Sequence, residues 1–407
     1  MVIFFTVSFS FAARMSLPVL IPVWEIEFKW SRTFLTFGAA LIMVVMGGVA
    51  PYAGHLLDKF GPRYLVSSGT ILSGCCVIFG ALMDPSSLFF SPVWIFIGVY
   101  CMLSAVGYGM VSLPVATATI TREFVEHRGL ATSIGTSGVG GGQLLFIPII
   151  AWAIELAGWR PTLILFGLLI IGMGILAFFL LSGETILRDT DTKKQTGERS
   201  KSFIKKFGIL IRSPIFWLLG GAYFICGFTT AGIVKVHLIP YAASCGFTIT
   251  AGAAATGVLA GFDMVGMVIS GYLTDKFHRP ALLGSVYFLR ALSFIMLFFI
   301  TDNYYLLFIF AIIFGTLDFA TVPPTAGLVA SHLGVSTMGF NMGILFLGHS
   351  IGGALGAISA GALFDLFQTY DWTWIAGLAL ALIAAVLAWS VPEKPETTTV
   401  RVESVTA

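Results

Sequence analysis

Twelve apolar stretches, each about long enough to cross a lipid bilayer, follow one another along this chain of 407 residues. A transmembrane α-helix needs about 20 mainly apolar residues to span the hydrocarbon core. The pattern therefore predicts an all-α membrane protein with twelve transmembrane helices. They are expected at residues 1–22, 34–57, 64–83, 93–120, 129–156, 162–182, 214–241, 249–273, 281–300, 304–330, 338–364 and 372–391.

The balance of apolar and charged residues excludes a soluble protein. Apolar residues make up 57% of the chain and charged residues only 10%, whereas about 25% of an ordinary soluble domain is charged. Membrane lipid is therefore the expected surrounding. The Lys and Arg residues are spread over several segments and form no single basic face, so nucleic acid is not an expected partner.

The distribution of Lys and Arg predicts the orientation in the membrane. Sixteen of the 22 fall in one set of connecting segments and three in the opposite set, and the remaining three lie within spans. Because cytoplasmic loops carry the excess of Lys and Arg, both termini are expected in the cytoplasm. The sequence predicts a multi-pass protein of the inner (plasma) membrane. The Lys- and Arg-rich segments are 57–63, 121–128, 183–213, 274–280 and the tail 392–407.

The chain repeats itself with an offset of about half its length. Pro114 has a counterpart in Pro323, and Trp159 has one in Trp372. Such a repeat predicts two related six-helix bundles around a site near the middle of the membrane. The predicted domains are an N-terminal bundle at 1–182, a cytoplasmic connector at 183–213, a C-terminal bundle at 214–391 and a cytoplasmic tail at 392–407.

A short motif occurs in both halves and resembles a known family. Gly54-x-x-x-Asp58-Lys59-x-Gly61-x-Arg63 resembles the loop motif of the major facilitator superfamily, and Gly271-x-x-x-Asp275-Lys276 resembles a second copy. The resemblance implies the twelve-helix fold and a gating role for this charge cluster, which would latch the two bundles in one state. An ordinary tight turn with a solvated charge pair is the alternative. The expected gating residues are Gly54, Asp58, Gly61, Arg63, Gly271 and Asp275.

A second signature resembles one branch of that superfamily. The segment Phe124-x-x-x-Arg128-x-Leu130-Ala131 is similar to the entry of the fifth helix in monocarboxylate transporters and bacterial oxalate–formate exchangers. The resemblance implies a small organic anion as substrate and adds Arg128 to the gating residues. Asp263 matches an aspartate of that branch, but Met267 stands where its arginine is expected.

Few ionisable side chains lie within the predicted spans. Each costs on the order of 2.5–3.5 kcal/mol in a span, so each requires a reason. With neutral histidines the count is three positive against two negative, which suits an anionic substrate. These residues are Arg14, Lys235, His237, Asp263, Arg290, Asp318 and His349.

The resemblance implies that helices 1, 4, 7 and 10 line the substrate cavity. Arg14 is then the preferred carboxylate clamp, because a guanidinium binds a carboxylate bidentately and keeps its charge. Its alternative is a structural pair with Asp263 or Asp318. Arg290 is expected to bind substrate, to bond helix-end carbonyls, or to extend towards the cytoplasm. Lys235 is expected to extend towards the extracellular end of its helix.

Proton coupling requires a group that titrates during the transport cycle. Asp263 and Asp318, desolvated in a closed cavity, are the expected proton carriers. His237 and His349 are alternatives as proton relays or as helix–helix hydrogen-bonders. The remaining substrate-binding candidates are Tyr108 in the fourth helix and Gln143 in the fifth, and the full set is Arg14, Tyr108, Gln143, His237, Arg290 and His349.

Motifs of enzymes and of metal sites are missing from the sequence. It shows no phosphate-binding loop, no His-Glu-x-x-His pair and no Cys-x-x-Cys. We therefore expect no enzyme and no cofactor, and five cysteines that pack as small apolar residues.

The sequence predicts a secondary transporter that works by alternating access. Its expected partners are a small monocarboxylate-like anion and protons, and the oligomeric state is left open because one chain suffices. The alternative is a proton-driven exporter of amphipathic or cationic compounds, in which Asp263 and Asp318 bind the cargo and Arg14 is structural. A membrane enzyme, a channel and a scaffold are rivals from other classes.

Overall fold

A computed structural model describes residues 1–84, 91–123, 135, 137–181, 207–208, 210–300, 303–333 and 338–393. The regular structure of these residues is entirely helical, and twelve segments are long and apolar enough to cross a membrane. The predicted fold class is therefore confirmed. Most spans also begin and end near the predicted residues, but the first helix continues to Phe28 and takes in Glu25 and Glu27, and the fifth-span helix begins at Gly138, whereas residue 129 was predicted.

The first half of the chain supplies six spans. They are α1 (Val2–Phe28), the two parts of α2 (Arg32–Gly80), a fourth span made of α3 (Pro92–Trp94), η1 (Ile95–Leu103), α4 (Ser104–Met110) and α5 (Leu113–Glu123), then α7 (Gly138–Ala157) and α8 (Trp159–Leu180). In η1 the helix widens into π-helical turns.

The second half supplies the other six. They are a seventh span made of α10 (Pro214–Cys226), the π-helical η2 (Gly227–Val234) and α11 (Lys235–Ser244), then α12 (Ile249–Lys276) and α13 (Arg279–Leu297), a tenth span made of α14 (Tyr304–Asp318), the 3₁₀ turn η4 (Phe319–Thr321) and α15 (Val322–Leu333), then α16 (Met338–Phe367) and α17 (Asp371–Trp389).

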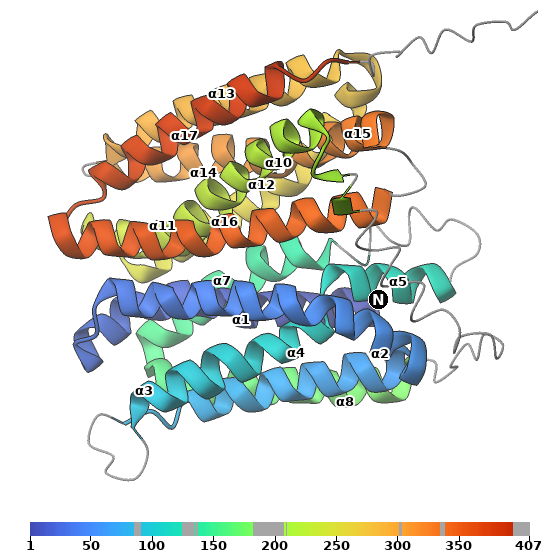
Figure 1. Ribbon diagram of the computed structural model, residues 1–407. Coiled ribbons are helices and arrows are strands. Elements are labelled where there is room, and N and C mark those ends of the chain that lie inside the picture. The colour runs from blue at the N-terminus through green and yellow to red at the C-terminus, as the bar shows by residue number, and fades with distance from the viewer. Residues whose placement is uncertain are drawn as a thin grey trace, which may run out of the picture.

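The two halves form separate layers of helices (Figure 1). Across the seam between them, α2 packs against α16, α7 against α12, and α1 against α11. Each layer has its own apolar core. Trp24 centres an aromatic cluster in the first half, where its ring lies 5.2 Å from Tyr100, and Trp374 does so in the second, 5.0 Å from Tyr241.

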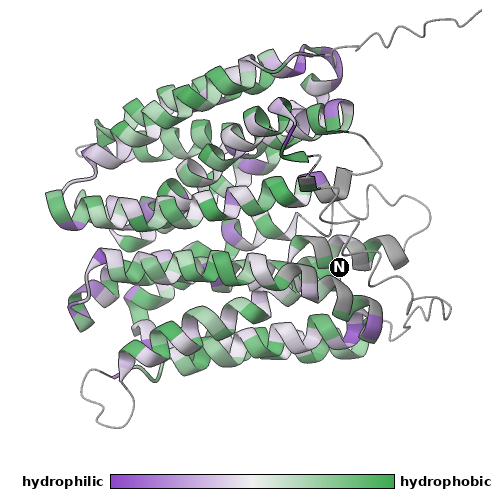
Figure 2. Ribbon diagram, in the orientation of Figure 1, coloured by the Kyte–Doolittle hydropathy of each residue, from purple (hydrophilic) through white to green (hydrophobic). Residues whose placement is uncertain are grey.

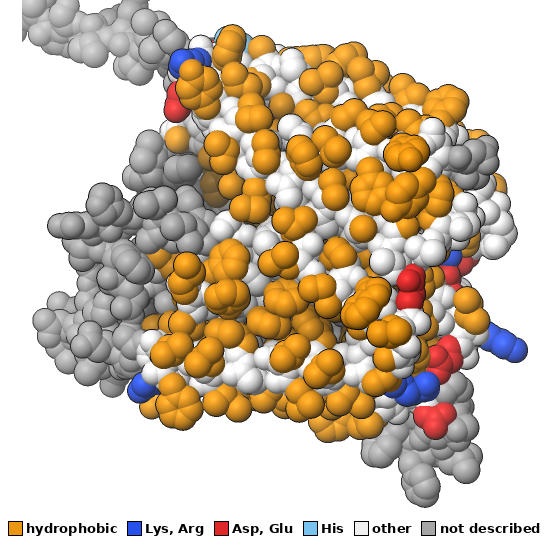
Figure 3. Space-filling model, turned by 180° about the vertical axis from the view of Figure 1, so that it is seen from behind, with side chains coloured by type: hydrophobic (Ala, Val, Ile, Leu, Met, Phe, Trp, Pro, Cys, Tyr) orange, Lys and Arg blue, Asp and Glu red, His pale blue; other side chains and the backbone are white. Residues whose placement is uncertain are grey.

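Apolar side chains cover the flank of the molecule, as expected for a protein surrounded by lipid. Figure 3 shows one such face, where hydrophobic side chains spread over the helices and charged ones gather at the ends. Figure 2 shows the same distribution along the ribbons. Leu165, Leu168 and Phe179 are more than half exposed on α8, which a soluble surface of this extent does not tolerate.

Four turns share one end of the molecule, opposite the N-terminus, and we call this end the far face (Figure 1). Lys29 directly follows α1 and Gly246 comes soon after α11, and both residues have positive φ (55° and 85°). Gly158 directly follows α7 and Gln368 directly follows α16, and both residues again have positive φ (86° and 56°). Equivalent residues of the two halves therefore close equivalent helices, and the internal repeat predicted from the sequence is present in the backbone.

Close helix packing at α12 gives a first testable prediction. A Cβ atom on Gly266 would lie 1.8 Å from the carbonyl oxygen of Thr316 on α14. We expect Gly266→Ala to push the two helices apart and to destabilise the protein by about 1–3 kcal/mol, measured as a lower melting temperature in detergent. Gly271→Ala on the same helix is the control, because a Cβ there meets open space. Equal melting of the two variants would contradict the prediction.

Candidate functional site

Three charged side chains from the seventh, eighth and tenth spans meet inside the second bundle. The Nζ atom of Lys235 lies 3.2 Å from Oδ2 of Asp263 and 2.7 Å from Oδ2 of Asp318. The side chains are only 10%, 2% and 6% exposed. We call these three residues the charged triad. The predicted extension of Lys235 towards the extracellular end was wrong, because two buried carboxylates hold it inside the bundle.

Irregular helix geometry places the members of the triad. Lys235 follows directly on η2, whose wide turns displace the helix before it resumes as α11. Asp318 is the last residue of α14, where the helix tightens into η4 ahead of Pro323 and Pro324. The tenth helix is broken at this point, since proline removes backbone donors from the helical ladder. Each of these irregular segments places one side chain, Lys235 or Asp318, inside the second bundle, where the two meet.

The triad holds one cation between two carboxylates, so it carries a charge of minus one when all three groups are ionised. The guanidinium of Arg290 interacts with Asp318 and supplies a second buried positive charge beside the triad. Oδ1 of Asp263 has no hydrogen-bond partner among the described residues. The arrangement therefore offers a proton an acceptor oxygen that no other group uses.

Arg290 lies beside the triad and is fully buried. Its Nη2 atom donates to the carbonyl oxygens of Leu317 (2.6 Å) and Asp318 (2.7 Å), and Nη1 donates to Sγ of Cys226 (3.1 Å). These bonds match the helix-end alternative predicted for Arg290. The guanidinium satisfies carbonyl groups at the break in the tenth helix and so fixes the backbone that carries the Asp318 carboxylate.

Arg14 lies on α1 at the seam between the bundles. It lines a small cavity together with Pro18, Ala39 and Val236, the last of which belongs to the second bundle. Nη1 lies 3.9 Å from Sδ of Met46, and Tyr108 lies close enough to interact with its charge. The alternative pairing with the two aspartates is not formed, because Lys235 holds both. Within the described parts of the chain, no carboxylate forms an ion pair with Arg14.

The other polar candidates lie apart from one another. Nε2 of Gln143 donates to the carbonyl of Val139 in its own helix (3.2 Å). His349 is half-buried, with its ring 4.9 Å from that of Tyr223 in the second bundle. Tyr108 is buried on α4 near Arg14. The structure thus does not bring the predicted set together at one site.

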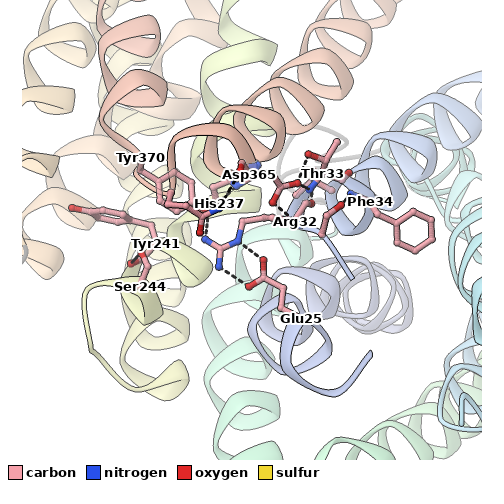
Figure 4. A network of polar contacts seen from close by, with 12 residues as sticks. Glu25, Arg32, Thr33, Phe34, His237, Tyr241, Ser244, Asp365 and Tyr370 are labelled. Atoms are coloured by element: carbon pink, nitrogen blue, oxygen red, sulfur yellow. Dashed lines mark hydrogen bonds and ion pairs between the residues drawn. The ribbon is translucent and has the colours of Figure 1, made fainter. Parts of the chain in front are cut away.

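His237 belongs to a polar network at the far face (Figure 4). Its Nε2 faces the carbonyl of Ala357 and its Nδ1 faces the hydroxyl of Tyr370, both at 3.0 Å. Since a carbonyl only accepts, Nε2 carries the proton and Nδ1 accepts from Tyr370. Burial raises the pKa of Tyr370, which lies in the turn between α16 and α17, so its hydroxyl stays protonated.

Arg32 joins the same network from the first bundle. Its Nε and Nη2 atoms each lie 2.5 Å from the carboxylate of Glu25, and Nη1 donates to the Tyr370 hydroxyl at 3.0 Å. The guanidinium also lies 3.6 Å from the ring centre of Phe364. His237 is therefore tied to a contact between the bundles at the far face. The available sequence signal for this network was one acidic residue near the end of each of two helices, Glu25 of α1 and Asp365 of α16.

The gating motif is described in part. Gly61 breaks α2 with φ 77° and ψ 168°, a conformation that favours glycine. Nε of Arg63 donates to the carbonyl of Phe178 (2.7 Å) and so fastens the third span to the sixth. In the second copy Gly271 has open space around it and Asp275 is exposed. The side chain of Asp58, the surroundings of Gly54 and the whole of Arg128 lie outside the described residues.

Known proteins similar to this chain are membrane transporters. A family model described as the Major Facilitator Superfamily matches residues 3–336 and 237–405. The uncharacterized MFS-type transporter YcxA of Bacillus subtilis (strain 168) is 27% identical over 351 residues, covering 84% of this chain and 82% of the relative. Monocarboxylate transporter 13 of Rattus norvegicus is 24% identical over 396 residues, covering 96% and 87%.

An oxalate:formate antiporter of Oxalobacter formigenes is 28% identical over 262 residues, covering 62% of this chain and 56% of the relative. Among solved structures, a D-xylose–proton symporter superposes with a TM-score of 0.75 at 15% identity, covering 96% of this chain and 97% of that chain. The family model covers most of the sequence, and the matched relatives are transporters. The protein therefore belongs to the major facilitator superfamily and is a membrane transporter, not an enzyme.

Proposed function

We propose that this transporter moves a small organic anion together with a proton, by alternating access, across a plasma membrane with both termini in the cytoplasm. The observation that carries the proposal is Lys235, shared between two buried carboxylates. Oδ1 of Asp263 has no hydrogen-bond partner among the described residues and lies beside the shared Lys235, so Asp263 is the proposed proton site.

Arg14 is the proposed anion site. It is a membrane-embedded cation at the seam of the bundles, its charge is not matched by a carboxylate in the described structure, and a cavity lies beside it. A substrate carboxylate supplies the missing partner through two parallel hydrogen bonds. Tyr108, buried on α4, is the proposed hydroxyl donor to the same anion. The monocarboxylate transporter and the oxalate:formate antiporter among the relatives support a small anionic cargo.

The two sites meet at the seventh span, which allows them to be coupled. Val236 lines the Arg14 cavity and directly follows Lys235 of the triad. Protonation of Asp263 frees Lys235 from one of its two partners and changes the charge next to the cavity wall. An anion bound at Arg14 neutralises that guanidinium and a proton bound at Asp263 neutralises that carboxylate, so the loaded protein rearranges with fewer buried charged groups.

Uptake into proteoliposomes tests the proposal. With labelled monocarboxylates outside, we expect an inward proton gradient to drive accumulation above equilibrium, and a protonophore to abolish it. Lipophilic cations serve as the competing cargo. If the protein moves such cations and no carboxylate, the anion proposal is wrong and the exporter reading of the aspartates holds.

A further inference from the structure

Two carboxylates at the far face each bind the start of a helix in the opposite bundle. Asp365, near the end of α16, accepts hydrogen bonds from the backbone N–H groups of Arg32 (3.1 Å) and Thr33 (2.8 Å) at the start of α2. It also accepts one from the Thr33 hydroxyl. Glu155, near the end of α7, accepts one from the backbone N–H of Thr250 (2.9 Å) at the start of α12. Both contacts cross the seam, in opposite directions.

The internal repeat relates the two contacts. Glu155 and Asp365 each lie three residues before the positive-φ residue that follows or ends their helix, Gly158 and Gln368 respectively. Thr33 and Thr250 each lie two residues after a hydroxyl N-cap, where Ser31 accepts from Phe34 and Thr248 accepts from Ala251. The contacts are thus one arrangement present twice, and a chance surface approach of two acids does not explain that.

The chemistry of the contacts favours attraction. The first N–H groups of an α-helix lack partners within the helix and carry partial positive charge. A carboxylate beside them accepts these hydrogen bonds and stabilises the helix end. Because each contact joins the two bundles, it forms only while the far face is closed. Arg32 strengthens the α2–α16 contact by bonding Glu25 on its own bundle and Tyr370 on the other (Figure 4).

We propose that Glu155 and Asp365 form a duplicated carboxylate latch, which holds the far face closed and releases at both positions when that face opens. The proposal rests on the alternating access proposed above, but not on the identity of the cargo or on proton coupling. Glu27 provides a contrast at the same face. It pairs with Arg160 at 2.7 Å within the first bundle and crosses no seam.

Distances between spin labels across the far face test the latch. Labels on Ala157→Cys of the first bundle and Ser244→Cys of the second report the opening, since both positions are exposed. The two half-buried cysteines, Cys75 and Cys245, are replaced by Ser, and the other three are buried. In nanodiscs, double electron–electron resonance then gives the ratio of open to closed populations without a need for transport.

We expect Glu155→Ala and Asp365→Ala each to raise the open-to-closed ratio about fivefold, and the double variant to raise it about 25-fold because distant contacts add. Glu27→Ala should leave the ratio at the wild-type value. An unchanged ratio in the double variant overturns the latch, as does an equal rise in Glu27→Ala.

Two further measurements keep the outcomes separate. If an alanine variant is not monodisperse in gel filtration, Glu155→Gln and Asp365→Asn remove the charge and keep the shape, and they must raise the ratio in the same direction. Carboxylate uptake is measured on the same preparations. If the double variant opens but the wild type takes up no carboxylate, the latch is supported and the proposed cargo is wrong. If the wild type shows proton-driven carboxylate uptake but the double variant keeps the wild-type ratio, the cargo is supported and the latch is wrong.

Discussion

Arg14→Ala is expected to abolish carboxylate uptake, with a fall in kcat/KM of about a hundredfold or more. Removing one partner of a desolvated charge pair costs about 2–5 kcal/mol, and the guanidinium at the cavity is the proposed anion partner. The measurement is initial uptake of a labelled monocarboxylate into proteoliposomes at fixed proton gradient. Arg14→Lys keeps the charge but loses the planar pair of donors, so it should retain part of the activity with a raised KM.

The matched control removes a cation that lies away from the cavity. Arg160→Ala deletes a guanidinium at the far face, where it pairs with Glu27, and should keep uptake within about threefold of the wild type, since exposed pairs contribute about 0–1 kcal/mol. Wild-type kinetics in Arg14→Ala, with the protein correctly folded, would falsify the anion site.

Asp263→Asn is expected to lose proton-driven accumulation, by about tenfold or more, while the exchange of labelled for unlabelled anion continues. The amide cannot take up a proton, so the proposed proton site is lost while Lys235 keeps Asp318 as its partner. Accumulation and exchange are measured on the same proteoliposomes at several external pH values, and the accumulation of the variant should no longer depend on pH. Asp371→Asn, an exposed carboxylate at the far face, should behave like the wild type. Retained proton-driven accumulation in Asp263→Asn contradicts the assignment.

Charge balance within the triad can be separated from proton binding by a rescue experiment. Lys235→Met leaves two buried carboxylates without their cation, which costs about 3–5 kcal/mol, so we expect low expression and a lower melting temperature. Adding Asp263→Asn restores the original charge of the triad, and it should restore melting but not proton-driven accumulation. Failure of the double variant to regain stability would show that Lys235 acts through packing and not through charge.

The fold was predictable because it depends on patterns along the chain. The length of each apolar stretch determines whether it spans a membrane, and the loop motif around Gly61 occurs at the break that the structure shows. Arg290 was predictable in one of its alternatives, since a buried guanidinium on a peripheral helix requires acceptors and backbone carbonyls supply them.

The grouping of the polar residues was not predictable in the same way. Lys235 was assigned to the end of its helix from its distance to Pro240, but its environment depends on how the seventh span packs against the eighth and tenth. Two aspartates predicted inside spans require a buried cation nearby, and this requirement was the sequence signal for the position of Lys235. His237 was expected in the cavity because it lies on the seventh helix. Its position is instead determined by its contact with Tyr370 at the far face.

The charged triad occurs in only one of the two repeats. The offset between Lys29 and Gly246 makes Pro18 of the first half the counterpart of Lys235, and Met46 the counterpart of Asp263. Under the proposed function, the second half therefore holds the proton site and the first half holds the anion site. Under this division, a descendant of this protein can acquire a new nutrient or waste product by substitutions around α1 alone, and inherit its energy source unchanged.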